Sequence, residues 1–119
     1  MGLIQIQHAF AQDVAHLLIQ AQERGYTVTL GEAWRTPEQQ AIYLKTGRSK
    51  VSKSQHMSRL AVDLNVFKDG ALCTRAQIKP LGDWWEGLSQ EHRWGGNWRG
   101  LVDAGKSSFV DAPHFEVLA

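Results

Sequence analysis

The chain has 119 residues and a net charge of +1, and 43% of its residues are hydrophobic. This length corresponds to a single domain, 1–119, with enough apolar residues for a buried core. The near-neutral charge argues against a nucleic-acid-binding protein, which would have a strong basic excess. The one cysteine, Cys73, excludes an internal disulfide.

The sequence predicts neither a signal peptide nor a membrane segment. Its first residues lack a basic region followed by a long apolar run. No stretch approaches the roughly 20 apolar residues that span a bilayer, so we expect no stable membrane insertion. We therefore expect a protein that is synthesised in the cytoplasm, and nothing in the sequence requires more than a monomer.

The first half of the chain predicts a helix, a strand and a second helix. Apolar residues recur at helical spacing over 9–24, and Gly25 follows as a stop. The β-branched and aromatic residues at 26–30 favour a strand. Thr36 as N-cap and Pro37 at the first helical position predict a helix that ends near 46–47.

A polar basic loop at 47–55 separates this half from the next strand. Residues 60–67 alternate in polarity, with Leu60, Val62, Leu64 and Val66 on one face, which predicts a half-buried strand. A turn at 68–70 then leads into a short return strand at 71–73.

The last third of the chain predicts a helix, a loop and a final strand. Residues 74–92 favour a helix that Pro80 interrupts or delays. Residues 94–98 (Trp-Gly-Gly-Asn-Trp) predict a loop with aromatic anchors, and 114–118 predict a last strand. Because helices and strands do not alternate regularly, the fold class is α+β, with a small antiparallel sheet and flanking helices.

Two histidines and an aspartate suggest a metal site. Asp63 lies inside a strand, where a carboxylate needs a partner or a metal. If 114–118 joins the same sheet, His114 and Glu116 share one face and His114 meets Asp63 across the sheet. Together with His56, they can fill three corners of a zinc tetrahedron and leave the fourth for water. Asp111, three positions before His114, can then take a proton from that water.

The spacing alone is a weak pattern, because a single histidine is more often structural or exposed than a metal ligand. His8, His16 and His92 are interpreted in that way.

Four short motifs strengthen the metal hypothesis. They are Ser54-x-His56-x6-Asp63, Asp111-x-x-His114-x-Glu116, Glu32-Ala-Trp-Arg35-Thr-Pro-Glu-Gln-Gln40 and Trp94-Gly-Gly-Asn-Trp98. Together they resemble the M15 metallopeptidase family, which includes VanY-like D-Ala-D-Ala carboxypeptidases, dipeptidases and phage L-alanyl-D-glutamate endopeptidases. The resemblance covers about 26–116. It implies a Hedgehog/DD-peptidase-like zinc peptidase fold.

The resemblance also implies roles for individual residues. It assigns the zinc ion to His56, Asp63 and His114, and it makes Asp111 the general base that acts on zinc-bound water. It makes Arg35 a contact for the substrate or the oxyanion, and the alternative for Arg35 is a structural salt bridge with Glu32 or Glu38.

Four further residues are candidates for supporting roles. Ser54 and Glu116 are suited to orient His56 and His114, although Glu116 is equally compatible with an exposed strand residue. Trp94 and Trp98 flank a Gly-Gly loop and are candidates for the wall of a cleft.

The loop before His56 contains Arg48, Lys50 and Lys53. These residues are compatible with a solvated surface loop or with a cationic patch that favours approach to anionic murein.

The family that the chain resembles has different acidic residues at the position of Asp111. Carboxypeptidases of the family usually place Glu there, whereas phage endopeptidases place Asp. With the 94–98 segment and a compact domain that has no separate cell-wall-binding domain, Asp111 favours an endolysin. Such an enzyme cleaves the L-Ala–D-Glu bond of the bacterial peptidoglycan stem peptide. It remains in the host cytoplasm until a membrane pore such as a holin gives it access to the wall.

Two alternatives remain open. One is a D-Ala-D-Ala carboxypeptidase or dipeptidase on the same scaffold. The other is a zinc-stabilised wall-binding or phage tail module without catalysis. A module without catalysis would be expected to lose the general base, so the retained Asp111 argues against it.

Overall fold

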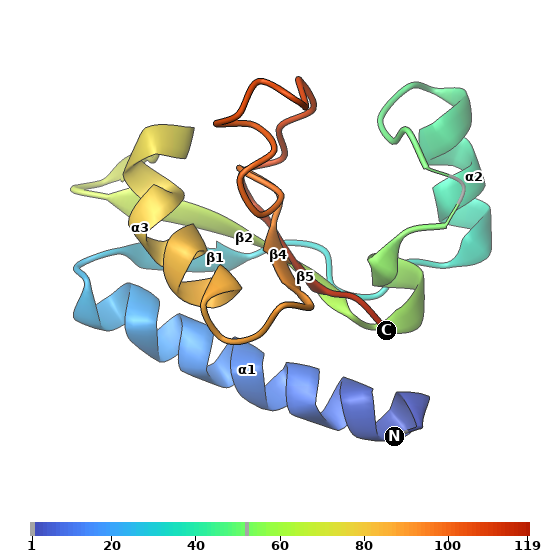
Figure 1. Ribbon diagram of the computed structural model, residues 1–119, viewed down its shortest axis with the longest axis horizontal. Coiled ribbons are helices and arrows are strands. Elements are labelled where there is room, and N and C mark those ends of the chain that lie inside the picture. The colour runs from blue at the N-terminus through green and yellow to red at the C-terminus, as the bar shows by residue number, and fades with distance from the viewer. Residues whose placement is uncertain (1, 52) are drawn as a thin grey trace.

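A computed structural model describes residues 2–51 and 53–119, and in these residues three α-helices accompany a small antiparallel sheet (Figure 1). The elements are α1 (Leu3–Glu23), β1 (Thr27–Leu30), α2 (Pro37–Lys45), the 3₁₀ turn η1 (Gln55–Ser58), β2 (Ala61–Lys68), β3 (Ala71–Leu72), α3 (Arg75–Glu86), β4 (His92–Trp94) and β5 (His114–Val117). The predicted α+β class is therefore confirmed. Among the described residues, no helix is long and apolar enough to span a membrane.

Strand β2 is the centre of the sheet. The strands follow the order β1-β2-β5-β4, and β3 pairs with the far end of β2. All pairings are antiparallel, and the register between β2 and β5 places Asp63 directly opposite His114. Asp63 and His114, which are 51 positions apart in the chain, thus meet on neighbouring strands.

The two faces of the sheet have different chemistry, as the alternation of β2 and β5 predicts. Apolar side chains of one face join a core with α1 and α3. The core includes Phe10, Leu17, Leu60, Leu64, Leu81, Trp85, Trp94 and Phe115. Asp63, His114 and Glu116 occupy the alternate positions. The functional side chains therefore lie on the face opposite the core, and Figure 1 shows α1 running below the sheet while the loops rise above it.

Helix α1 begins at Leu3, six residues before the predicted start at 9. Its apolar stripe extends one turn further than predicted, because Ile6 packs against the core four positions before Phe10. The backbone N–H groups of its first turn have no side-chain cap, since the N-cap is Gly2.

Helix α3 ends at Glu86 rather than near 92, and Pro80 lies inside it without interrupting it. A capping box between Thr74 and Gln77 stabilises the start of the helix. Pro80 is the sixth helical residue, so its ring removes a single backbone hydrogen bond near that start. Residues 92–94 form β4, which pairs with β5. The helical pattern of this part of the sequence did not predict that strand.

Replacement of Trp85 by Ala should lower the free energy of unfolding by about 3–5 kcal/mol, because a large buried cavity forms. Trp85 is fully buried, and its indole N–H donates to the Glu116 carbonyl at 3.0 Å. Urea denaturation measures the change, with the exposed Leu88→Ala as a control expected to change stability by less than about 0.5–1 kcal/mol. A loss below about 1 kcal/mol for the Trp85 variant would contradict this description of the core.

Candidate metal centre and active site

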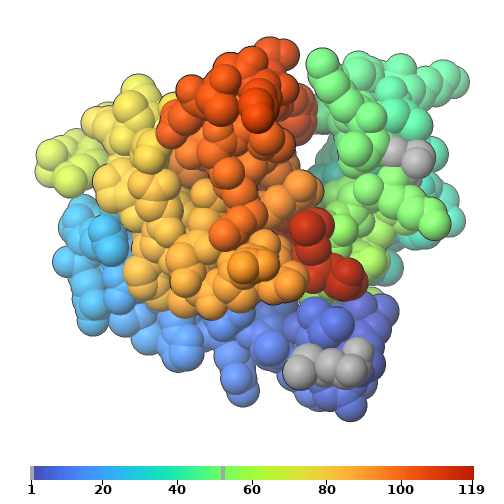
Figure 2. All heavy atoms as spheres, viewed as in Figure 1, coloured from blue at the N-terminus to red at the C-terminus, as the bar shows by residue number. Residues whose placement is uncertain are grey.

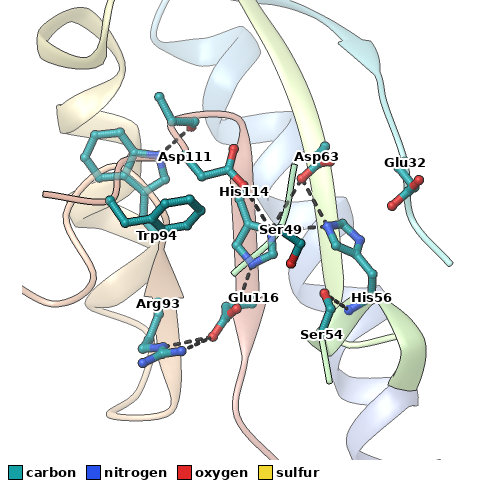
Figure 3. Close-up of polar contacts among 12 residues, drawn as sticks. Glu32, Ser49, Ser54, His56, Asp63, Arg93, Trp94, Asp111, His114 and Glu116 are labelled. Carbon is teal, nitrogen blue, oxygen red and sulfur yellow. Dashed lines mark hydrogen bonds and ion pairs between the residues drawn. The ribbon is translucent and has the colours of Figure 1, made fainter. Parts of the chain in front are cut away.

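His56, Asp63 and His114 form a compact cluster on the functional face of the sheet (Figure 3). They come from η1, β2 and β5, respectively. His56 Nε2 lies 3.2 Å from Asp63 Oδ1 and 3.2 Å from His114 Nδ1. His114 Nδ1 lies 3.4 Å from the same Asp63 oxygen. One nitrogen of each ring and one carboxylate oxygen thus form a nearly equilateral triangle.

This triangle fits a zinc ion. With zinc–ligand bonds of about 2.0–2.1 Å, tetrahedral geometry places ligand atoms about 3.3–3.4 Å apart. Asp63 Oδ1 is buried and has no hydrogen-bond partner among the described residues. A buried carboxylate oxygen without a partner is costly, and a cation between the three atoms would satisfy it. The donor set of two imidazoles and a carboxylate is also one that zinc prefers.

Both imidazole rings are held from behind by hydrogen-bond acceptors. His56 Nδ1 lies 2.9 Å from the Ala33 carbonyl, and His114 Nε2 lies 2.7 Å from Glu116 Oε1. A carbonyl or carboxylate oxygen only accepts, so these ring nitrogens donate. The lone pairs of His56 Nε2 and His114 Nδ1 can then face the metal, which is the usual arrangement behind ligating histidines.

The Glu116 carboxylate is itself held by Arg93, a residue that the sequence interpretation did not identify. Glu116 is 4% exposed and accepts from Arg93 Nε at 2.8 Å and from Arg93 Nη2 at 2.7 Å. The two residues are register partners on β4 and β5. The sequence predicted no strand at 92–94, so it gave no reason to pair Arg93 with Glu116.

The ionisable groups of the cluster shift one another's pKa values. Burial raises the pKa of Asp63, but contacts with His114 and His56 outweigh burial and hold this pKa well below its usual range. Burial lowers the pKa of His114, yet Asp63 and Glu116 outweigh it and raise the pKa to about 9. In the metal-free protein the site therefore already favours a positive charge beside Asp63.

Asp111 lies beside the cluster without joining the triangle. Its Oδ2 is 4.0 Å from His114 Nδ1. Burial raises the pKa of Asp111, and the charge of Asp63 raises it further, against the opposing effects of His114, His56 and Arg35. A carboxylate with a raised pKa is a better proton acceptor.

Gly95 holds the backbone that presents Asp111. The Gly95 carbonyl accepts from the Asp111 N–H at 2.8 Å, and the Gly95 N–H donates to the His114 carbonyl at 2.7 Å. A Cβ atom at this position would lie 2.2 Å from the Asp111 carbonyl oxygen. Only glycine permits this approach, so the first glycine of the 94–98 segment ties Asp111 to His114.

Arg35 lines the same cleft, and it also forms the salt bridge with Glu32 that the sequence left as an alternative. Its Nη1 donates to Gln40 Oε1 at 2.7 Å, and its guanidinium lies 4.7 Å from the centre of the Tyr43 ring. These contacts fix the guanidinium at the edge of the site. They are compatible with a contact to substrate, and that role stays a prediction.

Ser54 supports His56 differently from the prediction. Its hydroxyl accepts from the His56 backbone N–H at 3.2 Å and caps η1, while the Ala33 carbonyl contacts the imidazole. Ser54 therefore positions the backbone of His56 and not its ring.

The prediction that Trp94 shapes the cleft was wrong. Trp94 is fully buried, and its indole N–H donates to the Ala112 carbonyl at 2.7 Å. Gly82 and Gly96 lie against its ring so closely that a Cβ on either would approach within 2.2 Å. Trp98, in contrast, lines the cleft and lies 5.5 Å from the His114 ring, centre to centre.

The cluster opens into a cleft of about 350 Å³ between two loops. One wall is formed by basic and polar residues at 48–51 and 53–55, and the other includes Trp98, Leu101, Ser107 and Phe109. In Figure 2 these segments, green and orange, form neighbouring lobes at the top of the molecule. The volume of the cleft is near the lower end of the range for ligand-binding clefts.

The fold resembles that of two peptidases of known structure. Over 90% of this chain and 79% of the other, it resembles the L-Ala D-Glu endopeptidase ChiX of Serratia marcescens, with a TM-score of 0.63 and 22% identity. It also resembles a mutant of the vancomycin resistance D,D-pentapeptidase VanY from a VanB-type cassette, in complex with Zn(II). That match has a TM-score of 0.53 and 16% identity over 93% of this chain and 71% of the other.

The sequence identifies the family more narrowly. The chain belongs to the phage L-alanyl-D-glutamate peptidase family, which it matches over residues 3–118. It is 30% identical over 102 residues to the L-alanyl-D-glutamate peptidase of Listeria phage A118, which is 84% of this chain. The chain spans about a third (34%) of the length of that relative.

Replacement of His114 by Ala should abolish stoichiometric zinc binding, because one of three ligands is lost. Dialysis against zinc followed by elemental analysis should give one ion per chain for the unchanged protein and for the control His16→Ala, whose histidine is exposed on α1. Zinc at a hundred times its dissociation constant should also stabilise the unchanged protein by about 2.7 kcal/mol. Equal zinc content in the His114 variant would contradict the assignment.

Replacement of Glu116 by Gln should weaken zinc binding about 10–100-fold while the three ligands remain. The amide cannot accept a charge-assisted hydrogen bond from His114, and it loses the ion pair with Arg93. Competition with a chromophoric chelator measures the affinity, and circular dichroism verifies folding. The exposed Glu91→Gln is the control for loss of one negative charge. An unchanged affinity in the Glu116 variant would show that the ring of His114 needs no such partner.

Proposed function

We propose that this chain is a zinc-dependent peptidoglycan peptidase that hydrolyses the L-Ala–D-Glu bond of the stem peptide. The observation that best supports this proposal is the His56–Asp63–His114 triangle with Asp111 beside it, in a chain of the phage L-alanyl-D-glutamate peptidase family. The cleft that contains the cluster is open to an extended peptide.

His56, Asp63 and His114 would hold the zinc ion. Zinc bound there would supply Lewis acidity. This would polarise the scissile carbonyl and lower the pKa of water, so that water loses a proton and becomes a nucleophile at neutral pH. The chain's own contribution is the fixed orientation of the ligands through the Ala33 carbonyl and Glu116, so little reorganisation is needed when the ion binds.

Asp111 would transfer the proton. It accepts a proton from the attacking water as the water oxygen bonds to the L-Ala carbonyl carbon. It then delivers that proton to the D-Glu nitrogen as the carbon–nitrogen bond breaks. The products are a free amine on D-Glu and a carboxylic acid on L-Ala, which loses its proton at neutral pH. Its place beside His114, outside the ligand triangle, suits a group that must exchange protons rather than bind metal.

Arg35 would stabilise negative charge on the substrate. Glu32, Gln40 and Tyr43 hold its guanidinium in place at the cleft, so its charge is available without a large loss of side-chain entropy. This proposal keeps the salt bridge with Glu32 as the positioning contact for Arg35.

The cellular setting also remains a proposal. The natural partner would be the stem peptide of bacterial peptidoglycan. The enzyme would accumulate in the host cytoplasm and reach the wall once a holin-type pore opens. The need for a pore can be tested by adding purified, active enzyme to bacterial cells whose membranes are either intact or permeabilised.

Replacement of Asp111 by Asn should lower kcat on a synthetic stem peptide by at least about a hundredfold, because the amide cannot accept the proton. Zinc content and thermal stability should remain close to those of the unchanged protein. Asp103→Asn, which changes an exposed acid away from the cleft, is the control. Chromatography with mass detection identifies the products, and undiminished turnover in the Asp111 variant would remove its assignment as the base.

The product masses also distinguish the alternative on the same scaffold. Release of D-Ala or D-Ala-D-Ala from the stem peptide would assign the protein to the carboxypeptidase or dipeptidase branch. A folded, zinc-loaded protein that releases no product would favour a binding module.

A further inference from the structure

Three cations of the basic wall face the cleft without carboxylate partners. Arg48, Lys50 and Lys53 all line it. None of them takes part in an ion pair with another residue in the described part of the chain. Arg35 and Arg93, in contrast, each form a salt bridge, with Glu32 and Glu116, respectively. The cleft cations that have no carboxylate partner among the described residues are therefore Arg48, Lys50 and Lys53.

Two of these cations rest on aromatic rings. The Arg48 guanidinium lies 5.1 Å from the centre of the Tyr43 ring, which also contacts Arg35. Lys50 Nζ lies 5.9 Å from the centre of the Phe109 ring, on the opposite wall. An aromatic ring attracts a cation but accepts no strong hydrogen bond from it. The N–H donors of Arg48 and Lys50 thus remain available to an anionic ligand.

Lys50 belongs to the basic wall, and its ammonium group faces the opposite wall, which leads to Asp111. Its partner ring, Phe109, comes two residues before Asp111 in the chain. Phe109 also stacks on Trp98, with ring centres 6.1 Å apart, and Trp98 in turn lies against His114. These aromatic contacts run from His114 of the metal cluster through Trp98 and Phe109 to Lys50.

The side of the cleft next to Asp111 must hold the leaving amine, because Asp111 protonates it. In the proposed substrate this amine belongs to D-Glu, whose free α-carboxylate is attached to the same carbon atom. A carboxylate so close to the scissile nitrogen would lie near the unpaired cations.

We propose that Lys50 and Arg48 bind the α-carboxylate of the residue that follows the scissile bond. The inference rests on the proposed function and deepens it, since it makes these two residues determinants of substrate specificity. It distinguishes a stem peptide with a free carboxylate at this position from one in which the carboxylate is an amide. Charge-assisted hydrogen bonds of this kind are among the strongest available to a protein.

Two synthetic stem peptides test the proposal, one with the free α-carboxylate and one with the α-carboxamide at the residue after L-Ala. The zinc-loaded enzyme should cleave the carboxylate with a kcat/KM about 10–100-fold higher, mainly through a lower KM. Lys50→Gln and Arg48→Gln should each reduce this ratio severalfold, and the double variant should bring it close to one. Lys50→Arg, which keeps the charge, should retain most of the preference.

Lys68→Gln is the matched control, because it removes one positive charge at the far end of β2, outside the cleft. Its ratio should equal that of the unchanged enzyme, whereas general attraction to an anionic wall would affect both peptides and all charge variants alike. Equal cleavage of the two peptides, or an undiminished preference in the double variant, would overturn the proposal while the peptidase assignment stands. Cleavage of neither peptide at this bond would refute the proposed function and this inference together.

Discussion

The pairing of β2 with β5 determines the chemistry of this protein. Because the two strands meet in the register that sets Asp63 opposite His114, a carboxylate and an imidazole approach on the face of the sheet that is not occupied by the core. A shift of either strand by one residue would turn its functional side chain into the apolar core and bring its hydrophobic residues to the cleft. The apolar side chains of β2 and β5 therefore stabilise the fold and fix the position of the site at the same time.

Everything around this pair restrains it further. The capped turn η1 brings His56 to the pair, and the Ala33 carbonyl and Glu116 fix the two rings. Gly95 holds the backbone of Asp111 against that of His114. Such a concentration of buried polar groups is favourable only when each group has a partner, and a cation beside the Asp63 oxygen that lacks a partner would complete the set.

The sequence allowed the central part of this arrangement to be predicted, because strands have a strict period of two. Alternation in 60–67 and 114–118 was sufficient to place Asp63 and His114 on one face and to suggest that they meet. The motifs added His56, Asp111 and Arg35, which the structure places around the same cleft. The roles of these residues stay predictions.

Long-range packing explains what the sequence could not indicate. The burial of Trp94 depends on Gly82 and Gly96, and the pairing of Arg93 with Glu116 depends on a three-residue strand that resembles the end of a helix in sequence. The Ala33 carbonyl, and not the predicted Ser54 hydroxyl, contacts the His56 ring, and a backbone group leaves no signal in the side-chain pattern.

Mass spectrometry of fragments from purified peptidoglycan tests most directly whether this sheet-built cluster is a zinc peptidase centre. The digestion is carried out with zinc and again after removal of the metal by a chelator. New amino-terminal D-Glu and free L-Ala carboxyl groups, formed with zinc and absent without it, are the expected result. The same fragments in the metal-free digestion, or cleavage at another bond, would contradict it.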